Sequence, residues 1–201
     1  MGGPHAANSG LFDVSGAPPV TAEGFDNLSR DRYGSTAVLE PAGPRGSGTI
    51  TVIGGAGPEI VSPATETAET ITPLVFSGGE WALRSGPFLW DSAGSLQEPR
   101  FYPNTVQLPD STMVTVGGGS GRSEERGNHT TDGLRARRVE LFDPATETWR
   151  LGPAQREDRT YHSTAILLPD GRVWSAGDDN NPFPDDPASI DTAEIYSPPY
   201  L

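Results

Sequence analysis

The sequence predicts an all-β protein, namely a partial β-propeller with about three four-stranded blades. Three observations lead to this prediction: one layout of strands and turns recurs along the chain, helical periodicity is absent, and glycine and proline are frequent. The 201 residues include 25 glycines and 20 prolines, with short apolar blocks between them. Such blocks indicate many turns rather than disorder. A β-sandwich, which also contains many short strands, is the alternative fold.

The recurring layout starts each time with an arginine that is followed closely by an aromatic residue. It spans Arg32 to Gly55, Arg100 to Gly119 and Arg159 to Asp178. Each copy continues through a short strand and a turn, then returns along a second strand that ends near glycine. In the third copy the turn is Pro169-Asp170-Gly171, where glycine supplies the positive φ angle that a tight hairpin needs. The repetition favours the propeller over the sandwich.

Further strands are expected after each copy. They lie in Val139 to Pro153, in Ala193 to Leu201 and, after the first copy, in Ala68 to Phe76 followed by Gly79 to Pro87. An outer strand of a blade often carries a tryptophan that packs against its neighbour, and three tryptophans are expected to pack in this way. They are Trp81, Trp149 and Trp174.

These boundaries divide the chain into blades. We expect the first recognisable blade, with an N-terminal remnant, in residues 1–99, the second in residues 100–158 and the third in residues 159–201, truncated before a following C-terminal domain. Closing a propeller takes at least four blades. We therefore expect the chain to form an open arc within a larger ring, with unpaired strand edges and bare blade faces at its ends.

Charge and composition argue against several functions. The net charge of −13 disfavours non-specific binding to nucleic acid or to an anionic membrane. The chain has no cysteine, which excludes disulfides, thiolate metal sites and thiol catalysis within it. No apolar stretch approaches membrane-spanning length, so we expect no membrane insertion. The N-terminus also lacks the basic and apolar regions of a signal peptide.

Tyr161 and His162 stand side by side directly before the third hairpin. Imidazole is a good ligand for copper, and a phenolate oxygen is a weaker ligand that can accept a proton. Neighbours in a regular strand point to opposite faces, so both side chains can reach one metal ion only where the strand begins or bulges. The alternative interpretation is a packed aromatic beside a hydrogen-bonded histidine, without a metal.

The spacing of the repeats supports a local irregularity at this point. Ten residue steps separate Arg100 from Asp110, whereas eleven separate Arg159 from Asp170. The third copy thus has one extra residue before its turn. Unless a local irregularity accommodates it, this residue would shift the strand by one position and exchange its faces.

The segments "RTYHSTAILLPDGRV" and "AEIYSPPYL" resemble the copper radical oxidases, the galactose oxidase and glyoxal oxidase group of kelch-type propellers. The one-residue difference between the last two copies also matches that family. The segments "MGGPHAANSG" and "DRYGSTAVLEP" are similar to the middle of its propeller. The resemblance implies that this chain is the C-terminal part of the propeller. The full-length protein would then contain the rest of the ring and a C-terminal domain.

The family's function follows as an expectation from this resemblance. It is the oxidation of primary alcohols or aldehydes, including carbohydrates, by oxygen with release of hydrogen peroxide, in an extracellular, secreted enzyme. Copper would be bound by Tyr161 as axial ligand and catalytic base, and by His162 as equatorial ligand. The family's cysteine–tyrosine radical centre, substrate arginine and second copper histidine have no counterpart in this chain. We therefore expect an oxidoreductase fragment that is inactive in isolation. A non-catalytic kelch propeller that binds carbohydrate or protein is the alternative.

Other polar residues give weaker signals. His129 stands in a long polar insertion that is expected to be a solvated loop. An acidic group near the end of the chain offers oxygen ligands for calcium but lacks the spacing of an EF-hand loop, so we expect an acidic solvated turn. Its members are Asp178, Asp179, Asp185 and Asp186. Two glycosylation sequons start at Asn27 and Asn128.

Overall fold

The computed structural model describes residues 11–13, 20–22, 26–40, 48–57, 62–120, 136–178 and 190–201. All regular elements in these ranges are β-strands, and every strand pair is antiparallel. The described ranges contain no helix, in agreement with the all-β prediction. In particular, they hold no helix of the length and apolar character needed to span a membrane.

Three of the sheets repeat one meandering strand order. The first sheet contains β3 (Thr36–Glu40), β4 (Thr49–Ile53), β5 (Thr67–Ile71) and β8 (Asp91–Ser95). The second contains β9 (Asn104–Gln107), β10 (Met113–Val116), β11 (Arg138–Asp143) and β12 (Thr148–Ala154). The third contains β13 (Thr164–Leu167), β14 (Val173–Ala176) and β15 (Ala193–Tyr196). We call these sheets blades 1, 2 and 3.

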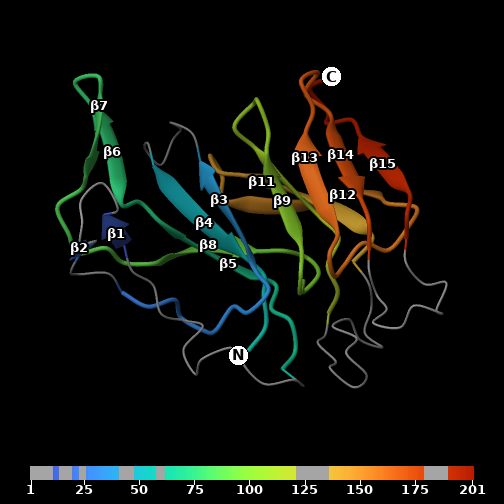
Figure 1. Ribbon diagram of the computed structural model, residues 1–201, viewed down its shortest axis with the longest axis horizontal. Coiled ribbons are helices and arrows are strands. Elements are labelled where there is room, and N and C mark those ends of the chain that lie inside the picture. The colour runs from blue at the N-terminus through green and yellow to red at the C-terminus, as the bar shows by residue number, and fades with distance from the viewer. Residues whose placement is uncertain are drawn as a thin grey trace.

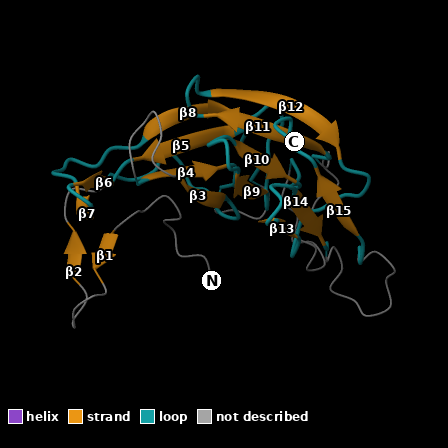
Figure 2. Cartoon of the chain, turned by 90° about the horizontal axis from the view of Figure 1, so that it is seen from above, coloured by secondary structure: helices purple, strands orange, loops and turns teal. Residues whose placement is uncertain are grey.

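The blades follow one another around an arc (Figure 1). Seen from above, β3, β9 and β13 lie on the concave side, whereas β8 and β12 form the convex side (Figure 2). This is the arrangement of a partial propeller, and it confirms the predicted fold class. Blade 3 differs from the prediction because only three strands are described in it, not four.

The outer strand of blade 1 was predicted wrongly. Residues 74–83 do not complete the blade but form a separate hairpin of β6 (Leu74–Ser77) and β7 (Glu80–Leu83). Gly78 and Gly79 adopt positive φ angles of 64° and 91°, which allows the tight turn between β6 and β7. The outer strand is instead β8, with the sequence Asp-Ser-Ala-Gly-Ser, whose residue types are poor strand formers. A shorter hairpin, β1 (Leu11–Asp13) with β2 (Val20–Ala22), precedes the blades.

A buried arginine begins each blade and pairs with a glutamate on the third strand of the same blade. The pairs are Arg32 with Glu69 at 2.7 Å, Arg100 with Glu140 at 2.9 Å, and Arg159 with Glu194 at 3.2 Å. The same guanidinium groups donate to the carbonyl oxygens of Gly54, Gly117 and Gly177. The repeated arginine of the sequence therefore joins three strands of its blade through charge-assisted hydrogen bonds.

Glycines at the ends of the second strands link neighbouring blades. The N–H of Gly55 donates to the carbonyl of Arg100 at 2.8 Å, and the N–H of Gly118 donates to that of Arg159 at 2.7 Å. A Cβ at Gly117 would lie 2.1 Å from the Arg159 carbonyl oxygen. Only glycine permits this approach and the positive φ of 68° at Gly117.

The core lies between the blades. One cluster joins blade 1 to blade 2 and contains Val38, Ile53, Ala68, Ala93, Leu96, Met113, Phe142 and Trp149. The indole N–H of Trp149 donates to the Ala93 carbonyl at 3.0 Å, so this tryptophan packs as predicted. A second cluster joins blade 2 to blade 3 and contains Val106, Leu108, Val114, Val116, Val139, Leu141 and Val173. Each blade is thus stabilised largely by its neighbours.

Candidate metal site at the start of β13

Tyr161 and His162 lie in the turn that leads into β13. The backbone N–H of Ser163 donates to the Thr160 carbonyl at 3.2 Å, and the Ser163 hydroxyl donates to the same oxygen at 2.8 Å. His162 has a positive φ of 61°, an unusual conformation for a non-glycine residue. Because β13 begins only at Thr164, strand alternation does not force the two side chains apart.

The rings of Tyr161 and His162 are in direct contact. Their centroids are 3.6 Å apart and their planes differ by 28°. Tyr161 is half-buried and His162 is exposed. The two candidate ligands therefore occupy one shared environment at the start of the inner strand of blade 3.

The extra residue of the third repeat lies within this turn. The positive-φ residue follows the repeat arginine by two positions in blade 1, at Gly34, and in blade 2, at Tyr102. In blade 3 it is His162, three positions after Arg159. The insertion is absorbed before β13 starts, so the inward and outward faces of that strand keep the same order as in blades 1 and 2.

A second tyrosine from the neighbouring blade packs on the pair. The Tyr102 ring centroid lies 5.1 Å from that of Tyr161, and the Phe101 ring centroid lies 4.0 Å from that of Tyr102. Asn104 of β9 donates to the Ser163 hydroxyl at 3.0 Å. Sequence reasoning recognised the aromatic residues after Arg100 only as part of the repeat. The proximity of Tyr102 to Tyr161 depends on the packing of blade 2 against blade 3.

Arg159 links the turn to the residues that flank β14 and β15. Its guanidinium group is buried and donates to the carbonyl oxygens of Gly177 and Thr192 at 3.1 and 2.9 Å. It also pairs with Glu194. Burial alone would raise the pKa of Glu194, but hydrogen bonds from the backbone N–H groups of Arg156 and Glu157, together with the Arg159 charge, outweigh it and lower that pKa.

Thr160 and Asp178 form a buried polar contact beside the turn. The Thr160 hydroxyl lies 3.0 and 3.1 Å from the two Asp178 carboxylate oxygens. In blades 1 and 2 the position of Asp178 is taken by Gly55 and Gly118, so this contact is specific to blade 3. Asp178 was expected in a solvated acidic turn, but it is buried and contacts Thr160, a partner that was not foreseen.

The two side chains are of types that bind copper, but two ligands do not complete a copper site. Tyr161 contributes one phenol and His162 one imidazole, both of which can bind copper. Among the residues that the structure describes, no group of three or more His, Cys, Asp or Glu side chains could hold a metal ion. The predictions for His129, Asn128, Asp179, Asp185 and Asp186 lie outside the described residues. The pair therefore fits a partial copper site that needs further ligands from elsewhere.

The sequence is similar to known proteins over most of its length. Two galactose oxidases of Gibberella zeae are 29% identical to the chain over 154 residues, which is 77% of the chain and 21% of each relative. The chain is related to the copper radical oxidases. No family model matches the sequence.

Structural comparison agrees on the fold of these copper radical oxidases. A fungal alcohol oxidase of the AA5 family, solved in complex with copper, has a TM-score of 0.74 and 24% identity, covering 99% of this chain and 38% of that one. A protein named YjhT has a TM-score of 0.55 and 11% identity, covering 82% of this chain and 42% of that one. The chain spans about a fifth of the length of the curated relatives it matches.

Proposed function

We propose that this chain supplies part of the copper site of a galactose oxidase-like or glyoxal oxidase-like enzyme. In this proposal His162 and Tyr161 would both hold the copper ion, and Tyr161 would also act as a base. The observation that supports it is the ring contact of Tyr161 with His162 at the start of an inner strand, in a chain related to copper oxidases. We also propose residues 1–99, 100–158 and 159–201 as the blade units of a kelch-type propeller.

The proposed reaction oxidises a primary alcohol or an aldehyde, including a carbohydrate, with oxygen as the acceptor. For an alcohol, two electrons and two protons leave the substrate, and oxygen is reduced to hydrogen peroxide. Copper, when bound, would supply the redox chemistry. Tyr161 would accept the hydroxyl proton at its phenolate oxygen, while neutral His162 would hold the metal through a ring nitrogen. We propose an extracellular location, as in the resembled family, and no turnover by the isolated chain.

Copper titration of the 201-residue chain tests this proposal. We expect weak binding of copper(II), because two protein ligands leave most of the coordination sphere to water. Binding should weaken as the pH falls, since only neutral imidazole coordinates. His162→Ala should abolish the specific binding and its nitrogen coupling in the electron paramagnetic resonance spectrum. His129→Ala and His5→Ala serve as matched controls and should preserve both.

An unchanged copper affinity in His162→Ala would overturn the proposed site. Tyr161 and His162 would then be a structural stacking pair. The non-catalytic propeller that binds carbohydrate or protein would in that case be the better account of the chain.

A further inference from the structure

The turn before β13 starts at a different residue type from its counterpart in blade 1. In blade 1 the N–H of Ser35 donates to the carbonyl of Arg32 at 3.2 Å, so the repeat arginine is the first residue of the turn. In blade 3 the N–H of Ser163 donates to the carbonyl of Thr160 at 3.2 Å, so the turn begins at Thr160. The extra residue of the third repeat thus separates the turn from the side chain of Arg159.

Blade 3 also carries a side chain where blades 1 and 2 have glycine. A Cβ at Gly55 in blade 1 would lie 2.8 Å from the backbone carbonyl carbon of Arg32, and a Cβ at Gly118 in blade 2 would lie 3.1 Å from the Cβ of Arg100. The repeat arginine therefore crowds this position in both blades. In blade 3 the arginine stands one residue further from the turn, and the position is occupied by Asp178. Among the three blades, the extra residue and the carboxylate occur together only here.

Thr160 and Asp178 form a buried contact at the first residue of the turn. Thr160 is 1% exposed and Asp178 is 3% exposed. The Thr160 hydroxyl lies 3.0 Å from Oδ1 and 3.1 Å from Oδ2 of Asp178, to which it donates. A hydrogen bond to a carboxylate is stronger than one between neutral groups, and exclusion of water strengthens it further. The contact therefore restricts the backbone at the point where the turn begins.

The last residue of the turn is held by the neighbouring blade. The Ser163 hydroxyl donates to the Thr160 carbonyl at 2.8 Å and accepts from Nδ2 of Asn104 in β9 at 3.0 Å. Tyr161 and His162 occupy the two central positions of the turn. The positive φ of 61° at His162 is sparsely populated for a residue with a Cβ. Such a conformation persists only where the surrounding contacts maintain it.

We propose that Asp178 is a positioning residue for the Tyr161–His162 pair. By accepting the hydrogen bond from the Thr160 hydroxyl, its carboxylate holds the turn in the conformation that brings the two rings into contact, with centroids 3.6 Å apart. Both side chains are then presented to one copper ion, a consequence that rests on the proposed function. Asp178 acts through Thr160, and loss of their hydrogen bond lets the rings separate.

Nuclear magnetic resonance of the metal-free chain tests the ring contact. The chain has three histidines, so few imidazole signals need assignment, and His162→Ala identifies those of His162. The ring current of Tyr161 should displace these signals upfield from their positions in the urea-unfolded chain. Thr160→Val has nearly the same shape but no hydroxyl, and it should move the signals toward the unfolded positions. Thr160→Ser keeps a hydroxyl and should retain the native displacement.

Thr51→Val is the matched control. The Thr51 hydroxyl donates to the Glu40 carboxylate in blade 1, and both residues are buried. This variant should also lower stability, because a buried carboxylate loses a donor. It should leave the His162 signals unchanged, since the contact lies in another blade. A displacement in Thr160→Val that is absent in Thr51→Val thus reports on the turn and not on general loosening of the fold.

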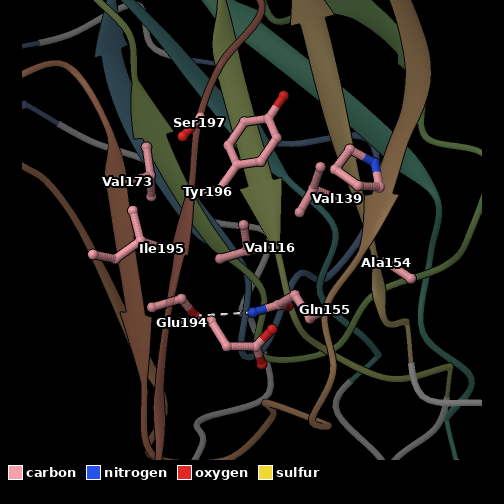
Figure 3. Close-up of a pocket in the computed structure, with 11 residues that line it drawn as sticks. Val116, Val139, Ala154, Gln155, Val173, Glu194, Ile195, Tyr196 and Ser197 are labelled. Carbon is pink, nitrogen blue, oxygen red and sulfur yellow. Dashed lines mark hydrogen bonds between the residues drawn. The ribbon is translucent and has the colours of Figure 1, made fainter.

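A double variant keeps the test decisive if Thr160→Val fails to fold. Replacing both partners by apolar groups of similar shape removes the buried carboxylate, so Thr160→Val/Asp178→Leu should fold. It should still lose the upfield displacement, because apolar contact is not directional. Neither position lines the cavity of about 330 Å³ between blades 2 and 3, whose walls include Gln155, Glu194 and Tyr196 (Figure 3). The double variant therefore leaves the walls of this cavity unchanged.

Copper(II) affinity gives the second readout. It should fall at least about tenfold in Thr160→Val, as is typical when a group that orients a metal ligand is removed. Thr160→Ser and Thr51→Val should bind copper as the native chain does. Unmoved His162 signals in both Thr160→Val and the double variant would overturn the proposal.

The two readouts separate this proposal from the proposed function. If His162→Ala abolishes copper binding but Thr160→Val does not weaken it, the proposed function stands and the positioning role of Asp178 fails. If His162→Ala leaves the copper affinity unchanged, the proposed function fails. The spectra of the metal-free chain then decide alone whether Asp178 holds the two rings together.

Discussion

Blades 2 and 3 share one strand pattern but differ in how completely they are enclosed. The Glu140 side chain is 0% exposed, whereas its counterpart Glu194 is 26% exposed. Leu141 is 3% exposed, and its counterpart Ile195 is 50% exposed. The repeat in the sequence thus determines which residues form each strand, while burial depends on the layers on either side.

The arginine pairs show the same difference. Both Nε and Nη2 of Arg100 donate to Glu140 Oε1, at 3.2 and 2.9 Å. In blade 3 only Nη2 of Arg159 reaches Glu194, and the buried Arg159 Nε has no hydrogen-bond partner among the described residues. An enclosed blade holds its ion pair in a tighter geometry than an open one.

Replacing the two arginines should give the largest difference in stability between blades 2 and 3. Arg100→Ala should lower the free energy of unfolding by about 3–5 kcal/mol, because it leaves the buried Glu140 charge uncompensated. Arg159→Ala should cost less, since solvent screens part of the Glu194 charge. Urea denaturation followed by circular dichroism measures both values. Exposed Arg150→Ala is the control and should change stability by less than about 0.5 kcal/mol. Equal losses for Arg100→Ala and Arg159→Ala would contradict the difference in enclosure.

The tryptophans of the two blades should differ by a smaller amount. Trp149→Phe removes the donor to the Ala93 carbonyl and leaves a buried acceptor, which should cost about 1–3 kcal/mol. Trp174 is half-buried in a row with Ile166 and Ile195, both 50% exposed. Trp174→Phe should therefore change stability by less than about 0.5 kcal/mol. Thermal unfolding of the two variants provides the measurement, and a larger loss for Trp174→Phe would show that blade 3 is enclosed after all.

Lowering the pH should have the smallest effect on stability, and this effect should distinguish blade 1 from blade 3. The pKa of Glu69 and that of Glu194 are lowered in the folded protein: burial opposes this shift, but hydrogen bonds from backbone N–H groups and the paired arginine outweigh it. Each carboxylate therefore stabilises the fold above its ordinary pKa of about 4.5, and this contribution is lost as the pH falls through the lowered value.

Salt separates the two carboxylates in this experiment. Glu194→Gln should reduce the loss of stability in acid, and its effect should diminish in high salt because Glu194 is partly exposed. Glu69→Gln should respond less to salt, since Glu69 is buried. Urea midpoints between pH 3 and pH 7 at low and high salt measure the effect. Identical salt responses would indicate that both pairs have the same solvent access.

Local patterns were sufficient for much of the fold. The third hairpin was predicted from the repeated layout and its Pro-Asp-Gly turn, and it forms β13 and β14. The candidate pair Tyr161-His162 was placed before this hairpin for the same reason. The outer strand of blade 1 was missed, because β8 has few strand-forming residues and the more suggestive residues 74–83 pair with each other.

The sequence by itself determined the all-β class, the repeated arginine and the position of Tyr161 and His162, since turn residues and strand periodicity act over a few neighbouring residues. Tertiary structure alone decided that Tyr102 packs on Tyr161 and that Thr160 contacts Asp178. It also decided that Tyr196 lines a cavity, whereas Phe142, at the same position in blade 2, packs on Trp149. These contacts join residues far apart in the chain, and they form only when neighbouring blades bury each other's apolar faces.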